Sequence, residues 1–387
     1  MTLITTSTDL AAFCARQVGA PYLTVDTEFL RDSTYWPRLC LIQVAGPEDV
    51  AAIDALADID LTPLYALLTD PQILKVFHAA RQDMEIFHQL LDGQLPGPIF
   101  DTQVAAMVCG FGEQVGYETL VRKIAGAKIE KASRFADWSQ RPLTEKQLNY
   151  ALADVTHLRQ IYEVLRDELN ESGRARWLDE EMSTLTDPAT YRMDPSAAWQ
   201  RMKPKSTDRK YLAVLREVAA WREREAQRRN VPRNRVLRDE QIQDIAAHTP
   251  RNPQQLARTR GLSYDFARGR MGEGIIQAVE AALVLPPDSR PKPPRKHETP
   301  PGAGPLVELL KVLLKAKSES HGVAQKLIAT TADLERIAAG DTIDLPALRG
   351  WRHHVFGADA LALKQGKLAL AAEDQQVAFI RIERRDR

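Results

Sequence analysis

The stretch Thr24-Val25-Asp26-Thr27-Glu28-Phe29 decides how this sequence is interpreted. It continues an apolar run that begins at Tyr22 and predicts a buried strand. Residues two apart on a strand share a face, so the carboxylates of Asp26 and Glu28 should lie close together. Close carboxylates raise each other's pKa unless a cation lies between them. Hard oxygen ligands suit Mg²⁺ or Mn²⁺. The same spacing would also arise from two solvated acids on the exposed face of a strand.

The sequence around this stretch predicts a mixed α/β sheet. Short runs rich in Val, Ile and Leu predict five strands, over 22–30, 38–46, 50–56, 73–77 and 98–100. Helices are expected over 61–68, 82–91 and 144–169, the last opened by a capping box of Thr144 and Gln147. Short links favour antiparallel pairing of the first three strands, and the later helical links favour βαβ units. We therefore expect a five-stranded mixed sheet flanked by helices.

Length and composition predict a protein of several domains. The 387 residues suffice for two to four domains, and no window approaches 18 uncharged apolar residues. The N-terminus lacks the pattern of a secretory signal, and three separated cysteines match no zinc or redox spacing. We expect a cytoplasmic protein with no membrane association. Residues 1–170 carry 14 Lys+Arg against 23 Asp+Glu, and residues 171–387 carry 38 against 29. This split predicts an acidic site served by a surface that attracts polyanions.

The remainder of the chain predicts a series of helical domains. After a first domain over 1–172, residues 173–206 predict a connecting segment and 207–285 a helical domain. Residues 286–305 contain eight prolines and predict a semi-rigid linker. Residues 306–387 predict a second domain of similar size and class, again all helical, although no residue-level repeat relates the two.

Three further residues are candidates for the same site as Asp26 and Glu28. Asp83 follows a predicted strand at the start of a helix, and strand ends are where open sheets place ligands. Tyr150 and Asp154 are four residues apart on a predicted helix and share one face. The aspartate could bind a metal and the phenol a nearby water. Taken alone, Asp83 could simply be an acid that stabilises a helix N-terminus. Likewise, Tyr150 could be a core aromatic residue and Asp154 a solvated acid.

Together these segments resemble the DEDD superfamily of 3′→5′ exonucleases. The first motif is Asp26-Thr27-Glu28-Phe29, the second is Asp83, and the third is Tyr150-x-x-x-Asp154, whose tyrosine is typical of the DEDDy branch. More narrowly, the chain resembles the ribonuclease D family, on segments that include 34–43, 100–103 and 141–144. The resemblance implies an RNase H-like exonuclease fold. It also implies two divalent ions, Mg²⁺ or Mn²⁺, held by Asp26, Glu28, Asp83 and Asp154, with Tyr150 orienting the attacking water.

The helical domain over 207–285 resembles HRDC domains, small helical bundles associated with nucleic-acid binding. The resemblance rests on 215–222, Glu225-Ala226, 230–233 and Asp239-Glu240. Residues 201–238 carry 13 Lys+Arg against 4 Asp+Glu, which independently predicts a surface for phosphates, although a merely solvated charged face remains an alternative. The last domain is HRDC-like only by analogy with the family's architecture.

The resemblance implies a metal-dependent 3′→5′ exoribonuclease that releases 5′-mononucleotides from RNA 3′ ends, and the predicted acidic site and basic surface agree with it. The family resemblance implies tRNA precursors and other small structured RNAs as substrates, and no obligate protein partner is inferred. A DEDDy exonuclease acting on DNA is the nearest alternative, because a metal site does not distinguish sugars. A non-catalytic nucleic-acid-binding protein is a further alternative. A helicase accessory is disfavoured because no GxxxxGK[ST] loop is present.

Overall fold

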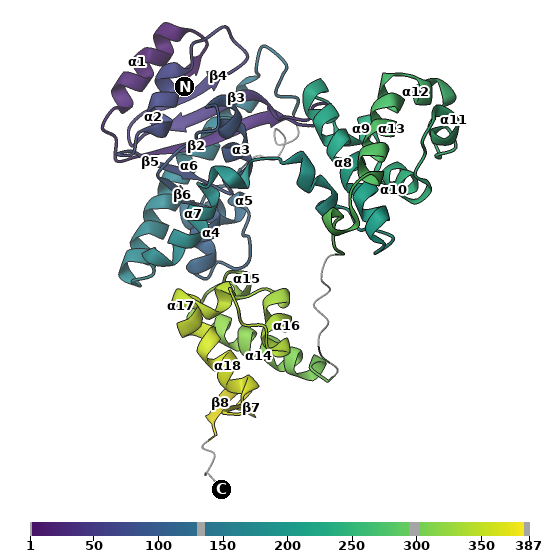
Figure 1. Ribbon diagram of the computed structural model, residues 1–387. Coiled ribbons are helices and arrows are strands. Elements are labelled where there is room, and N and C mark those ends of the chain that lie inside the picture. Colours follow the sequence, from purple (N-terminus) through teal and green to yellow (C-terminus); the bar gives the residue numbers. More distant parts are fainter. Residues whose placement is uncertain (1, 130–135, 294–299, 301, 383–387) are drawn as a thin grey trace.

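Six strands form the sheet of the N-terminal part of the chain, residues 2–171, in a computed structural model that describes residues 2–129, 136–293, 300 and 302–382 (Figure 1). Their order is β1-β4-β3-β2-β5-β6, with β2 antiparallel to β3 and parallel to β5. The strands are β1 (Thr2–Ile4), β2 (Tyr22–Leu30), β3 (Arg38–Ala45), β4 (Val50–Asp54), β5 (Leu74–Phe77) and β6 (Ile99–Asp101). The predicted mixed topology is confirmed.

The predicted count of five strands is wrong, because β1 is a sixth strand at the sheet's edge. It pairs parallel with β4, Leu3 opposite Ala52. Three residues are too few to show the alternation that identifies a strand in a sequence. The helix that follows it, α1 (Ser7–Gln17), was also not predicted; its N-cap is Thr6, whose hydroxyl accepts from the Asp9 amide.

Helices cover both faces of this sheet. The α-helices of the N-terminal part are α1, α2 (Thr62–Thr69), α3 (Arg81–Leu90), α4 (Thr102–Val108), α5 (Tyr117–Leu120) and α6 (Glu145–Glu171). Side chains of α1, α2 and α3 share one core with Leu23 and Val25 of β2. The opposite face packs on α6, where Thr24 of β2 donates a hydrogen bond to the Val155 carbonyl at 2.8 Å. Alternate residues of β2 therefore face α3 and α6.

Helix α6 begins where the sequence predicts. Thr144 is its N-cap, and the reciprocal hydrogen bonds with Gln147 complete a capping box. The segment before it is fixed to the sheet by Arg141, whose guanidinium pairs with Asp54 of β4 at 2.6 Å and donates to the Cys40 carbonyl at 2.9 Å. The start of α6 is thus held in register with β3 and β4.

The middle part of the chain, residues 209–283, is a bundle of helices beside the sheet (Figure 1). Its helices are α8 (Arg209–Arg229), α9 (Arg233–Val236), α10 (Asp239–His248), α11 (Pro253–Leu256), α12 (Tyr264–Arg268) and α13 (Arg270–Leu283). Between α6 and α8 lie α7 (Asp179–Leu185) and several 3-10 turns, of which η5 (Pro195–Arg201) packs along α8. The linker predicted over 286–305 begins with one short turn, Pro287–Ser289, and much of it lies outside the described residues.

The C-terminal part, residues 304–381, is helical until Lys364 and then forms a hairpin. Its α-helices and strands are α14 (Gly304–His321), α15 (Gln325–Ile328), α16 (Thr331–Ala339), α17 (Gly350–Arg352), α18 (Ala358–Lys364), β7 (Leu368–Glu373) and β8 (Gln376–Arg381). The prediction of an all-helical domain is therefore wrong for β7 and β8. The Ala- and Leu-rich sequence of β7 favours a helix, but Asp374 and Gln375 both have positive φ and form the hairpin turn.

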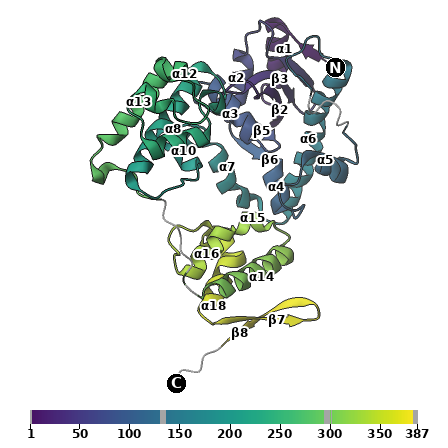
Figure 2. The ribbon, with the colours of Figure 1, turned by 90° about the vertical axis from the view of Figure 1, so that its right-hand side faces the viewer.

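The C-terminal part packs directly on the N-terminal part, below α4 and α7 (Figure 2). The amide of Ala324 donates to the Met107 carbonyl at 2.9 Å, and the rings of Trp177 and Trp351 stack at 4.3 Å. Buried Arg352 pairs with Glu180 and Glu181 of α7. One hydrophobic cluster contains buried side chains of both parts, among them Val108, Leu120, Leu165, Leu310, Leu314 and Ile337.

No helix within the described ranges has the length and hydropathy needed to cross a membrane. All three cysteines are free thiols; Cys14 and Cys40 are buried and Cys109 is half-buried.

Candidate active site

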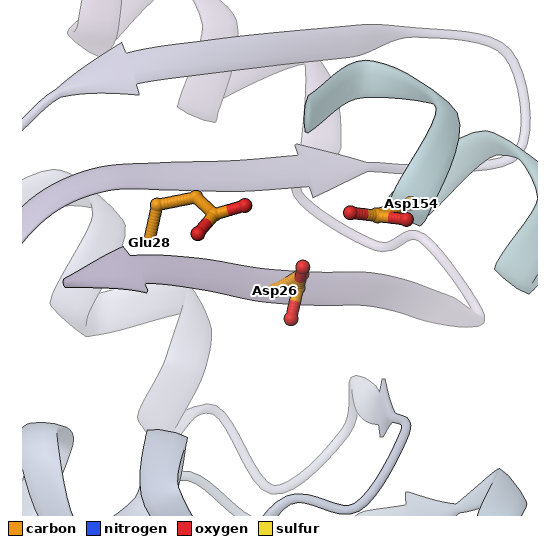
Figure 3. A group of neighbouring side chains, drawn as sticks. All are labelled: Asp26, Glu28 and Asp154. Atoms are coloured by element: carbon orange, nitrogen blue, oxygen red, sulfur yellow. The ribbon is translucent and has the colours of Figure 1, made fainter. Parts of the chain in front are cut away.

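Three of the predicted acids converge at the centre of the sheet's α6 face. Asp26 and Glu28 lie on β2, and Asp154 approaches them from α6 (Figure 3). One carboxylate oxygen of each residue lies within 4.8 Å of the others. Pairing between β2 and β5 stops at Thr24, and the register with β3 shifts between Glu28 and Phe29. The acids therefore lie where the sheet opens beside β2, next to a bulge of the kind that re-aims side chains near active sites.

Helix α6 places Tyr150 beside the same carboxylates. The Tyr150 side chain forms a hydrogen bond with Asp154, which favours the charged form of that carboxylate. The tyrosine ring lies 6.1 Å from the ring of buried Trp138. Packing against Trp138 and spacing along α6 both fix the phenol at this position.

Asp83 lies in the first turn of α3 and is buried. Its Oδ1 accepts a hydrogen bond from the Thr27 hydroxyl at 2.5 Å. It is not among the three acids whose oxygens gather within 4.8 Å, but the charge of Asp26 helps to raise its pKa, second to burial. The fourth predicted acid therefore lies on the α3 side of β2. It is close enough to Asp26 for that charge to affect its pKa, and the Thr27 hydroxyl holds its carboxylate.

Burial and mutual repulsion disfavour the charged forms of these carboxylates. Burial, followed by the charges of Asp26, Asp154 and Asp83, raises the pKa of Glu28 to about 10. Burial raises the pKa of Asp154 to about 7, against the opposing hydrogen bond from Tyr150. Burial and the charge of Asp154 raise the pKa of Asp26 well above its ordinary range. No Lys or Arg of the described ranges forms an ion pair with these carboxylates, so the oxygen-rich group fits a divalent cation.

A cavity of about 400 Å³ opens beside the carboxylates. Asp26, Tyr150 and Asp154 line it together with His78, Gln103 and Tyr117. The sequence had not singled out the last three as site residues. The Tyr117 hydroxyl donates to the Ala153 carbonyl at 3.3 Å and also to that of Asp154, so it fixes α6 at the level of the site. Gln103 lies in the segment 100–103, which resembles the ribonuclease D family, and His78 precedes Asp83 by five residues; nothing else in the sequence signalled a role for them.

Asp101 lies behind this cavity and binds the backbone amides of two residues that line it, Ala79 and Gln103. Its carboxylate caps α4 and also accepts from the amides of Ala79 and Ala80, at 3.0 and 2.8 Å. Ala79 has a φ of 57°, which is strained for a residue with a Cβ. The clamp holds the strained turn that leads from β5 into α3 and towards Asp83.

Fold and site together define a 3′→5′ exonuclease, and the family model described as 3'-5' exonuclease matches residues 1–170. A second family model, of the HRDC domain, matches residues 211–279. Ribonuclease D of Granulibacter bethesdensis is 53% identical over 98% of this chain and 96% of its own length, and that of Nitrobacter hamburgensis is 52% identical over 99% and 100%.

The crystal structure of Escherichia coli RNase D, an exoribonuclease involved in structured RNA processing, matches with a TM-score of 0.81 at 31% identity. That match covers 94% of this chain and 98% of the other. The chain belongs to the ribonuclease D family of 3′→5′ exoribonucleases.

Proposed function

We propose that the chain removes 5′-mononucleotides from RNA 3′ ends, with Asp26, Glu28, Asp83 and Asp154 as metal ligands. The convergence of three carboxylates from β2 and α6, with Asp154 buried and Asp26 and Glu28 half-buried, is the observation that carries this proposal. A group of acids with such raised pKa values suits a site that a cation completes. The ribonuclease names of the relatives favour RNA over DNA as substrate.

We infer that Mg²⁺ or Mn²⁺ is the native cation and that two ions bind. Asp26, Glu28 and Asp154 would hold one, and Asp26 with Asp83, through water, the other. When bound, such ions supply Lewis acidity and a water of lowered pKa. The carboxylates would hold the ions in place, and a phosphodiester would meet positive charge at these acids only when cations are bound. Asp83 would be aligned by the hydroxyl of Thr27.

Tyr150 would act as a positioning group for the attacking water. It shares the cavity wall with Asp26 and Asp154, and its hydrogen bond to Asp154 ties its orientation to a metal ligand. A fixed hydrogen-bonding group can align a nucleophile without taking up its proton. The cavity beside it would receive the terminal nucleoside.

A 5′-labelled RNA with a single free 3′ end tests the proposal. We expect a ladder that shortens one nucleotide at a time, release of 5′-mononucleotides, no cleavage in chelator, and recovery when Mg²⁺ or Mn²⁺ is restored. A DNA oligonucleotide of the same sequence serves as the matched control. Internal cuts, or undiminished trimming in chelator, would contradict the proposal.

Several finer inferences rest on the sequence and the family. Four of them stay predictions: tRNA precursors as natural substrates, a cytoplasmic location, independence from protein partners, and the domain boundaries. So does the assignment of the C-terminal part as a second HRDC-like domain, since the HRDC family model matches the middle part alone.

A further inference from the structure

The loop between β2 and β3 docks the middle part of the chain beside the active site. Tyr35 of this loop is buried, and its hydroxyl donates to Glu223 of α8 and accepts from Arg233 at 3.0 Å. Asn230, which ends α8 with a φ of 48°, accepts from the amides of Tyr35 and Trp36 at 3.1 and 3.0 Å. The same loop therefore joins the strand of Asp26 and Glu28 to the HRDC helices.

Arg31, at the start of the loop, fixes its other side. Its guanidinium forms two hydrogen bonds with Glu85 of α3, at 2.8 and 2.9 Å. Glu85 is two residues from Asp83, so the loop is tied to both elements that carry the proposed metal ligands. A ligand bound at this junction would lie close to the reacting end of an RNA strand.

A cavity of about 340 Å³ lies at this junction and is rich in guanidinium groups. Its lining includes Arg31 from the loop, Arg201 from η5 and Arg222 and Arg233 from the middle part. Two carboxylates, Glu223 and Asp239, also line it, but both are already paired: Glu223 with Arg233 at 2.6 Å and Asp239 with Arg222 at 2.5 Å.

Two of these arginines have unused hydrogen-bonding capacity. Arg222 is 4% exposed, and its Nη1 donates to the Leu237 carbonyl and to Asp239, yet its buried Nε has no hydrogen-bond partner in the described part of the chain. Arg201 is exposed and contacts Met193 Sδ at 3.2 Å, and within those same ranges it forms no ion pair. A buried donor that no protein group satisfies is available to an anion that enters the cavity.

We propose that this cavity binds a phosphate of the RNA backbone a few nucleotides from the bond that is cleaved. The inference rests on the proposed function and adds a binding site to it. Guanidinium forks match phosphate oxygens, and a phosphate would occupy donors that the paired carboxylates leave unused. Arg31 follows Glu28 by three residues, which on an extended strand is about 10 Å. One strand of RNA can therefore reach both the carboxylates and this cavity.

The first test measures RNA affinity against salt for the full chain carrying Asp154→Asn, so that RNA is bound without being consumed. In that background Arg201→Gln should weaken binding and reduce the slope of log affinity against log salt by roughly 0.7, the value for one contact with a single strand. Arg224→Gln, an exposed change on the far side of α8 from Arg222, should alter neither. Equal losses from the two substitutions, or no loss from either, would refute the site.

A second test identifies the phosphate. RNAs carrying one uncharged methylphosphonate at successive positions should show a single sensitive linkage near the 3′ end, and Arg201→Gln should abolish that sensitivity. A flat scan overturns the proposal, and so does a scan unchanged by Arg201→Gln. Inorganic phosphate binding that depends on Arg201, together with a flat scan, would assign the cavity to free phosphate. Metal-dependent trimming by the unsubstituted chain reports separately on the proposed function.

Discussion

At the level of single residues, the proposed chemistry depends on neighbouring carboxylates whose charged forms are unfavourable without a cation. Replacing Asp154 by Asn keeps the size of the side chain and removes its charge. We expect kcat to fall by about a hundredfold or more, the loss typical of removing one electrostatic group from an active site. The Asn variant should fold, because burial already opposes the charged form of Asp154. Normal trimming by Asp154→Asn, measured on a labelled RNA, would remove it from the site.

Tyr150→Phe tests positioning rather than ligation. Loss of the hydroxyl should lower kcat by about a hundredfold or less and leave RNA affinity nearly unchanged, because the ring still packs near Trp138. The pKa of Asp154 should rise further without the hydrogen bond that lowers it. Single-turnover rates and equilibrium binding separate the two effects. An unchanged rate would exclude Tyr150 from the mechanism.

The carboxylate group also predicts how the metal-free protein responds to pH. The folded pKa of Asp154 is about 7, and an unfolded aspartate titrates near 4, so the folded state keeps a proton that the unfolded state releases. Its contribution to stability is complete below about pH 4 and is lost as pH rises through about 7. Glu28, with a folded pKa of about 10, extends the loss to higher pH.

Thermal unfolding in chelator should therefore give a Tm that falls from pH 5 to pH 8. Excess Mg²⁺ should reduce the fall, because bound cations replace the protons and stabilise the folded state. Glu28→Gln should flatten the dependence in chelator. A metal-free Tm that is constant or rises over this range would contradict the electrostatic account.

The sequence was sufficient to predict the acids but not their arrangement. The two-residue spacing of Asp26 and Glu28 and the four-residue spacing of Tyr150 and Asp154 follow from strand and helix periods, and the structure brings these residues together. The hydrogen bond from the Thr27 hydroxyl to Asp83 was not predictable, because it joins β2 to α3 and depends on how these two elements pack. Nor were the contacts of Tyr117, whose hydroxyl reaches backbone more than thirty residues away.

Secondary-structure elements position these residues, and α6 is the one that the sequence predicts best. Its capping box and long amphipathic pattern are local signals. Strand β1 is too short to give such a signal, and the hairpin of β7 and β8 lacks the Asn-Gly turn that usually marks one. Elements with a strong local pattern were predictable, and elements that depend on pairing with distant chain were not.

The cap of α6 yields a prediction at this scale. Thr144→Ala removes the hydroxyl that accepts from the Gln147 amide and should cost about 1 kcal/mol locally. Amides in the first turn of α6 should then exchange with deuterium about fivefold faster. Thr144→Ser, which keeps the hydroxyl, is the matched control. Equal exchange in the Ala variant would show that Arg141 alone holds the start of the helix.

The whole molecule is organised by two junctions that the sequence did not reveal. Composition predicts the three parts and the proline-rich segment. It does not predict that Tyr35 joins the middle part to the sheet, or that one cluster of apolar side chains spans the N- and C-terminal parts. Both junctions depend on contacts between side chains that are far apart in the sequence, and no local sequence pattern predicts such contacts.

The shared cluster predicts that the chain can be divided. Residues 1–293 and 302–387, produced together as separate polypeptides, should co-purify as a stoichiometric complex. Trp351→Glu in the shorter piece should abolish co-purification, because it places a charge against the stacked ring of Trp177. Lys315→Glu, an exposed charge change on α14, should leave the complex intact. Independent elution of the unsubstituted pieces would refute the prediction.

A premature stop codon near the end of the gene would therefore have an outsized effect. Loss of the C-terminal part would remove the C-terminal side chains of the hydrophobic cluster to which Val108, Leu120 and Leu165 belong. The truncated product would retain every proposed catalytic group. Its newly exposed apolar surface, however, would favour aggregation and degradation by proteases. Frameshifts beyond the last proposed ligand would then abolish activity through loss of protein rather than through loss of chemistry.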